Sequence, residues 1–106
     1  MASRIYEGAV GIIFRPKWRD EDATAIDISA QTTIEIEFTK PDGTKVVKDC
    51  ILPNGGTDGF QDYVTVTNDL IGEGPWKAQG HFITPTLDLW GTIHRFRVVA
   101  NLTDLT

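Results

Sequence analysis

The sequence contains little that would build a disulfide-linked, membrane-spanning or metal-centred protein. It has one cysteine, Cys50, so an internal disulfide is excluded. No apolar run approaches the ~20 residues of a membrane-spanning helix, and the N-terminus carries no apolar stretch of signal-peptide length. The two histidines, His81 and His94, have no cysteine or acidic residue at a spacing that completes a metal shell. We therefore expect a chain that is made in a cytoplasm and binds no metal, cofactor or membrane.

Basic residues are also in the minority. Ten Lys and Arg stand against fifteen Asp and Glu, for a formal net charge of −5. Because a chain with this balance is repelled by phosphate backbones, we expect no nucleic-acid partner. With 106 residues, 41% of them hydrophobic, the chain can bury one core but not two. We expect a single domain over residues 1–106, with an N-terminal arm at 1–8 and a short C-terminal tail at 101–106.

Alternation of apolar and polar residues at period two is the pattern that the sequence does have. Its clearest instance is Thr33–Thr39, where Ile34, Ile36 and Phe38 would face one side of a sheet and two glutamates the other. Pro, Asp and Gly then favour a hairpin turn in Lys40–Thr44. Similar segments recur at the spacing of roughly 8–12 residues that is typical of β-sandwiches. The expected strands are residues 9–14, 25–28, 33–39, 45–51, 63–67, 76–83 and 91–100, with a loop over 52–62.

About seven antiparallel strands leave two apolar sheet faces to bury, and packing two sheets face to face buries both. The sequence therefore predicts an all-β, antiparallel β-sandwich. Trp76 is expected near its centre because a buried indole removes ~150–250 Å² from contact with water. The residues expected in the core are Ile12, Phe14, Ile28, Ile34, Ile36, Phe38, Val64, Val66, Trp76, Ala78, Phe82, Phe96 and Val98.

No motif in the sequence supplies an active site. Cys50 follows Asp49, whose charge raises a thiol pKa, so we interpret it as a small half-buried side chain. The acidic run Asp20–Asp22 lacks the Gly and distal Glu of a calcium loop and is interpreted as a solvated loop. Gly72–Gly74 precedes a strand pattern, which favours a tight turn over a phosphate cradle. We expect a protein that is not an enzyme, with both histidines as half-exposed strand residues.

The tryptophans are the candidate binding residues. Trp18 lies between Arg15 and Arg19 in a charged segment without apolar periodicity, a composition typical of an interface anchor. The alternative is that Trp18 folds back as a lid over the end of the sandwich. Trp90 is interpreted as an edge aromatic that covers the core. The candidate interface residues are Trp18, Arg15, Arg19 and Tyr6.

Four phrases of the sequence resemble one protein family. Asp27–Phe38, Lys40–Thr44, Gly74–Gln79 and Phe96–Val98 resemble, in this order, the "DIS" strand, "KPDG" hairpin, "GxWKxQ" strand and final "FxV" strand of the Ig-like domain of tailed-phage upper baseplate proteins. The resemblance covers about residues 10–98. It implies an Ig-like fold and a structural virion subunit, present in several copies, that joins tail or baseplate to fibres.

Residues 15–24 and 52–62 have no counterpart in that family, and the chain ends at Thr106 without the family's long extension. These departures favour an adaptor or connecting subunit over a receptor-binding one. We expect a non-enzymatic virion protein, made in the host cytoplasm, that is homo-oligomeric or multi-copy and binds other tail, baseplate or fibre subunits. The alternatives are a capsid decoration protein and a carbohydrate-binding β-sandwich that stacks sugars on Trp18 and Trp90.

Overall fold

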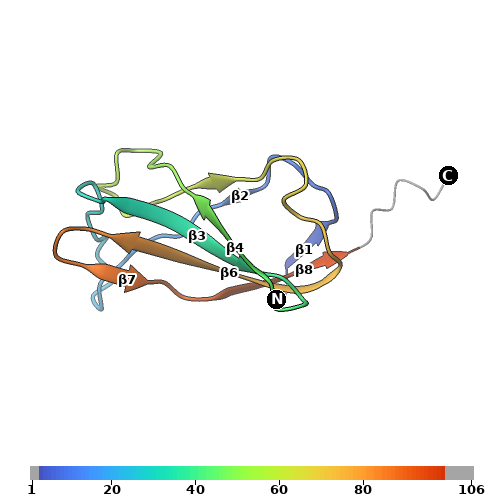
Figure 1. Cartoon of the computed structure of the whole chain (residues 1–106). Coiled ribbons are helices and arrows are strands. Elements are labelled where there is room, and N and C mark those ends of the chain that lie inside the picture. Colours follow the sequence, from blue (N-terminus) through green and yellow to red (C-terminus); the bar gives the residue numbers. More distant parts are fainter. Residues whose placement is uncertain (1–2, 100–106) are drawn as a thin grey trace.

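The computed structural model of the chain describes residues 3–99, which form an all-β fold. These residues contain no helix, and hence none that is long and apolar enough to cross a membrane (Figure 1). The strands are β1 (Ser3–Tyr6), β2 (Ile13–Phe14), β3 (Thr33–Thr39), β4 (Lys45–Asp49), β5 (Tyr63–Val64), β6 (Gly74–Ile83), β7 (Asp88–Trp90) and β8 (His94–Val99).

Six of these strands form one large sheet in the order β1-β8-β6-β3-β4, with β7 paired to β6 as well. The long strand β6 is its centre: it pairs with β3 along one edge, and with β8 and then β7 along the other. The β3–β4 hairpin forms around the turn at Lys40–Thr44, as the sequence predicts. Every pairing in this sheet is antiparallel except that of β1 with β8, which is parallel.

The second layer is a short antiparallel ladder of β2 and β5, extended by loops on either side. Isolated bridges of Lys17 with Phe60 and of Ile51 with Asp62 hold these loops together. Figure 1 shows this layer above the large sheet. The two layers make a β-sandwich with principal extents of 51 × 24 × 24 Å, which confirms the predicted fold class.

The core lies between the two layers. Of the residues expected there, Ile36, Phe38, Trp76 and Phe96 are all buried. Their rings pack edge to face or tilted, with centroids 6.3 Å apart for Phe38 and Trp76 and 5.8 Å apart for Trp76 and Phe96. The indole N–H of Trp76 donates to the carbonyl of Gly72 over 2.7 Å, so the buried ring keeps its hydrogen bond. The other buried apolar residues are Phe14, Trp18, Ile28, Ile34, Cys50, Leu70, Ala78, Phe82 and Val98.

Strand β5 has the predicted alternation with the opposite phase. Val64 and Val66, expected in the core, are 42% and 55% exposed, whereas Thr65 is 1% exposed. The Thr65 hydroxyl accepts the backbone N–H of Ile12 at 3.0 Å, and Tyr63 packs against the core. A shift of one residue turns every side chain of a strand to the other face, so the assignment of Val64 and Val66 to the core is wrong.

The N-terminal region differs from the sequence expectation. Residues 1–8, expected as an arm, contain β1, which is an edge strand of the large sheet. Of the strand expected at residues 9–14, only Ile13 and Phe14 are paired in a ladder, and residues 25–28 contribute a single bridge from Ala25 to Arg19. Strand β7 was not expected. The C-terminal tail at 101–106 lies outside the described residues.

Candidate functional site

Trp18 is buried, with 7% of its surface exposed. Its ring packs edge to face on Phe82 with centroids 4.6 Å apart, and its N–H donates to Oε1 of Gln61 over 2.7 Å. Gln61, itself fully buried, donates in turn to the carbonyl of Glu35 on β3 over 2.9 Å. The anchor hypothesis for Trp18 is therefore wrong, and its ring is a lid held to the large sheet by Gln61. Sequence reasoning missed Gln61 because a lone glutamine in a loop belongs to no pattern.

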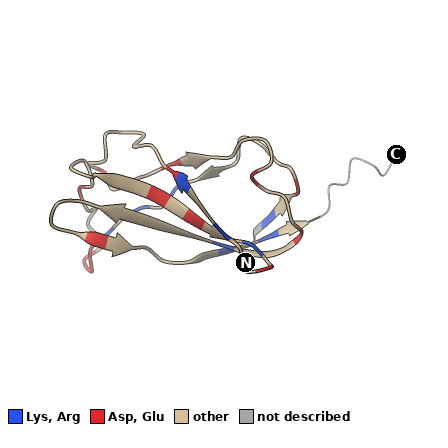
Figure 2. Cartoon of the chain, in the orientation of Figure 1, with Lys and Arg blue, Asp and Glu red and all other residues tan. Residues whose placement is uncertain are grey.

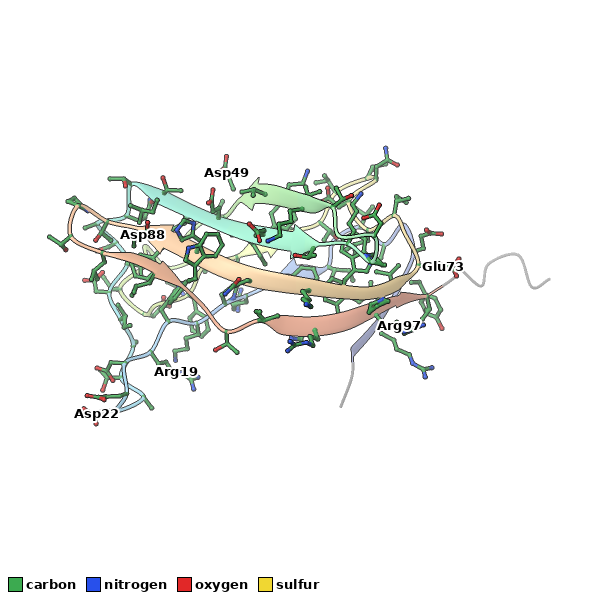
Figure 3. All side chains as sticks on the ribbon, turned by 60° about the horizontal axis from the view of Figure 1, so that its bottom comes forward. Arg19, Asp22, Asp49, Glu73, Asp88 and Arg97 are labelled. Carbon is green, nitrogen blue, oxygen red and sulfur yellow. The ribbon has the colours of Figure 1, made fainter. Side chains whose placement is uncertain are left out.

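The other candidate interface residues, Arg15, Arg19 and Tyr6, are exposed. Arg15 binds Asp62 through two hydrogen bonds of 2.6 and 2.7 Å, so its guanidinium joins two loops. Arg19 is exposed in its loop, and Tyr6 is exposed on β1 beside β8. In Figure 3, Arg19 lies well away from the end of the sheet that Arg97 of β8 marks. Tyr6 therefore lies on another part of the surface than Arg19, and the role of these exposed residues in an interface stays a prediction.

A histidine held between two carboxylates lies on the outer face of the large sheet, the face turned away from the core. Pairing of β3, β6 and β7 sets Glu35, His81 and Trp90 side by side. The ring nitrogens of His81 lie 2.9 Å from Oε1 of Glu35 and 2.5 Å from Oδ1 of Asp88. Trp90 stacks flat on the imidazole, with centroids 3.8 Å apart and planes 4° apart. His81 is thereby 6% exposed rather than half-exposed, whereas Trp90 keeps 49% exposure and covers the histidine rather than the core.

The environment of His81 favours its charged form. Burial lowers the pKa of His81, but the hydrogen bonds to Glu35 and Asp88 outweigh burial and raise the pKa above its ordinary value of about 6.5. Only the protonated ring can donate to both carboxylates at once. Since both nitrogens are engaged, the cluster acts as an ionic clamp that holds β7 against β6 and β3.

The opposite end of the same face is basic. Register sets Lys77 directly beside Arg95, and Arg97 beside Arg4, on adjacent strands. All four side chains are exposed, and none has an ion-pair partner within residues 3–99. Figure 2 shows the resulting separation, with basic residues on β1 and β8 and acidic residues on β3 and β7. Composition could not reveal this charge pattern, because the net charge of −5 averages over the whole surface.

The opposite side of the sandwich carries an apolar surface. Ile13 and Val64 pair across the β2–β5 ladder, and they are exposed together with Val10 and Val66 on the flanking residues, at 42–58%. We call these four residues the aliphatic patch. Ile13 also lines a groove of about 410 Å³ between the layers, together with Ile36 and with polar residues such as Arg15 and His94. Exposed aliphatic side chains on and beside a paired ladder are typical of a protein–protein contact.

The remaining candidates have local structural roles. The Asp20 carboxylate accepts the backbone N–H groups of Asp22 and Thr24 at 2.9 and 3.0 Å, which shapes its own loop. The Gly72 N–H donates to a carboxylate oxygen of Glu7 over 2.8 Å, so the glycine turn ties β6 to the N-terminal region. Burial raises the pKa of Cys50 to about 11, and the hydrogen bond from Gln61 only partly offsets that rise. A thiol in that environment stays protonated and unreactive.

No protein-family model and no curated protein matches the sequence.

Proposed function

We propose that this chain is a non-enzymatic structural subunit of a tailed-phage particle, an adaptor or connecting subunit between tail or baseplate and fibres. The ordered phrases of the sequence suggest the particle, and the β-sandwich supplies the rigid body that an adaptor requires. The observation that carries the proposal is the presence of two different docking chemistries on opposite sides of one slab: the aliphatic patch on the β2–β5 ladder and the charged outer face of the large sheet.

A connecting subunit has to hold two neighbours at once. Two surfaces that face opposite ways allow both neighbours to bind without competing for the same residues. They also differ in chemistry, because one attracts apolar segments by burial and the other attracts charged partners by complementarity. Of the four patch residues, Ile13 also lines the groove of about 410 Å³, which offers space for a side chain inserted beside the patch. The partner of the patch is therefore an apolar segment of another virion subunit.

The test is particle composition. Tailed particles are purified from the strain that encodes the chain and analysed by mass spectrometry, and cryo-electron microscopy then places the chain in the tail or baseplate. In the double variant Ile13→Asp/Val64→Asp the patch carries two charges, and we expect a folded chain that is no longer incorporated. Leu87→Asp, at an exposed apolar residue of the β6–β7 turn, is the matched control and should still be incorporated.

Three outcomes would contradict the proposal. Purified particles that lack the chain altogether would exclude a virion role. Normal incorporation of a folded Ile13→Asp/Val64→Asp variant would exclude the aliphatic patch as the docking surface. Density on the capsid rather than the tail would favour the alternative of a capsid decoration protein.

A carbohydrate-binding module is the second candidate, and Trp90 is the observation that favours it. With Trp18 buried, Trp90 is the tryptophan left to act as a stacking platform, and the carboxylate of Asp88 lies beside it as a hydrogen-bond acceptor. Binding on a glycan array that Trp90→Ala abolishes and Trp18→Phe preserves would favour this function over the first.

A further inference from the structure

The charges on the outer face of the large sheet are complementary to themselves under a two-fold rotation, because positions that the rotation exchanges carry opposite charges. Gln79 lies at its centre on β6. Arg97 pairs with Pro75, four residues before Gln79, and Asp88 pairs with Ile83, four residues after it. Opposite charges thus stand at equal distances from Gln79, on the same side of β6. At about 3.3 Å per residue, each lies roughly 13 Å from Gln79 along the strand.

The same relation holds on the other side of β6. The pairings of β4 with β3 and of β3 with β6 place Lys45 level with Lys77, two residues before Gln79. Asp49 is level with His81, two residues after it. Lys45 and Asp49 therefore form a second pair of opposite charges, also centred on the level of Gln79. Figure 3 shows the arrangement from the outside, with Asp49 and Asp88 toward one end and Arg97 at the other.

We propose that the outer face binds a second copy of this chain, face to face, around a two-fold axis that passes close to Gln79 and runs across the strands. This rotation reverses the strand direction. The half of the face with β7 and β8 then lies against the same half in the partner, and the half with β3 and β4 lies against its own counterpart. Arg97 of one copy then meets Asp88 of the other, and Lys45 meets Asp49. Each contact occurs twice, as an isologous interface requires.

The same rotation brings a basic residue onto an exposed aromatic ring. Arg95 is level with Lys77, and Trp90 is level with His81, so Arg95 of one copy faces the exposed indole of Trp90 in the other. An arginine over a tryptophan ring is a favourable cation–π contact, and both residue types are enriched among those that dominate binding energy. Lys77 lies opposite the protonated ring of His81, and the carboxylates of Glu35 and Asp88 that bind this ring offset the repulsion.

On the axis itself, the level of Gln79 contains Glu37 and Val47, which meet their own symmetry mates. Each Glu37 carries the ammonium of Lys45 at 3.4 Å, which offsets the repulsion between the two carboxylates. Val47 is 50% exposed and gains apolar contact with its mate.

The partner relieves a cost that the isolated chain carries. Lys77 beside Arg95 and Arg97 beside Arg4 are like charges directly opposite each other, which destabilises a sheet. In the dimer Arg97 gains the carboxylate of Asp88 and Arg95 gains the ring of Trp90, so each like-charge pair obtains one favourable partner. The slab, with extents of 51 × 24 × 24 Å, is large enough for the ~800 Å² that each partner buries in an interface of standard size.

This inference deepens the proposed function by naming the occupant of one of its two docking surfaces, and only its biological setting rests on that function. A chain found in particles but monomeric in solution would overturn the inference alone. A dimer of the predicted geometry with no chain in particles would overturn the proposed function alone.

The test uses charge reversal and mixing. The purified chain is studied by analytical ultracentrifugation, with Arg97→Asp and Asp88→Arg as the two variants. Each variant places like charges opposite each other in its own homodimer, so we expect dimerisation at least about tenfold weaker than in the wild type. An equimolar mixture of the two variants restores opposite charges at both contacts and should therefore form heterodimers.

Controls separate the interface from general charge effects and from damage to the clamp. Arg19→Asp and Asp22→Arg make the same charge changes in a loop away from the face and should leave dimerisation unchanged. Because Asp88 also binds His81, Lys45→Glu and Asp49→Lys repeat the exchange at residues outside the clamp and should behave in the same way.

Four results would overturn the proposal. The first is a wild-type chain that stays monomeric at millimolar concentration. The second is a dimer that the single variants do not weaken. The third is a mixture of complementary variants that forms no heterodimer. A monomer whose basic end instead binds an unrelated acidic protein would equally exclude the second copy as the occupant.

Discussion

His81 shows how the neighbours of a single residue decide its role. From the sequence, it is a polar residue in an alternating strand, equivalent to His94. In the fold, it is enclosed by Glu35, Asp88 and Trp90, whereas His94 is exposed. The three neighbours come from two other strands, at sequence separations of 7 to 46 residues. The same residue type is therefore an ionic clamp at one position and a surface ring at the other.

The clamp predicts a pH dependence of stability. Since the folded state raises the pKa of His81 above its unfolded value of about 6.5, the stabilisation is fully present below about pH 6.5 and is lost as the pH rises through the folded pKa. We expect His81→Gln to be less stable than the wild type at pH 6, with the difference shrinking toward pH 9. Urea unfolding monitored by tryptophan fluorescence across this range measures it.

The matched control is His94→Gln, which removes the exposed histidine and should keep the wild-type pH profile. A difference between wild type and His81→Gln that stays constant from pH 6 to pH 9 would show that protonation of His81 contributes nothing to stability.

At the scale of elements, the strands with one wet face are the ones that the sequence predicts well. In β3 every second residue is buried, as its alternation requires, and Lys40–Thr44 specifies the following turn. The prediction of which β5 residues are buried was wrong because both faces of Tyr63–Thr67 carry side chains that can pack in a core. Contacts with β2 and Asp69 select the face with Tyr63 and Thr65, through the hydroxyl of Thr65 and the hydrogen bond that Tyr63 donates to Asp69. The prediction of an N-terminal arm missed β1 because its pairing partner, β8, lies about ninety residues later in the chain.

Two glycines of the turns and loops give a matched comparison. Gly43 and Gly59 both have positive φ, at 89° and 78°. A Cβ on Gly43 meets nothing within 4 Å, whereas a Cβ on Gly59 would lie 2.6 Å from the backbone oxygen of Trp18. We expect Gly43→Ala to cost about 1 kcal/mol of unfolding free energy, the conformational term alone. Gly59→Ala should cost a further ~1–3 kcal/mol for the steric clash.

Chemical denaturation of both variants measures these costs. Equal losses would mean that the loop at Gly59 shifts away from Trp18 without cost, and the tight contact between loop and lid would then have no energetic role.

At the scale of the whole molecule, Cys50 reports on opening of the sandwich. Its thiol is 8% exposed and its pKa is raised to about 11 by burial, so the native state offers almost no thiolate to a labelling reagent. We expect labelling at pH 8 to be slow in buffer and to accelerate with urea in parallel with unfolding. Gly59→Ala should label faster than the wild type because less free energy is needed to open it. Rapid labelling of the wild type in buffer would show that the layer above Cys50 opens without global unfolding.

Assembly is a property of the whole surface. The composition predicted an acidic chain, and the fold sorts its charges so that one face has a basic and an acidic end while the far side is aliphatic. Trp18, which the surrounding composition predicted as an interface anchor, belongs to neither surface, because its indole is buried and hydrogen-bonded to Gln61.

The sequence by itself determined the all-β architecture, the central hairpin and most of the core. These depend on alternation and on turn residues, which are local properties that a chain carries into any fold. Only the tertiary structure decided the phase of β5, the burial of Trp18, the clamp around His81 and the symmetry of the charged face. Each of these depends on which distant strand lies alongside, and such contacts are chosen by packing and by satisfaction of buried polar groups across the whole molecule.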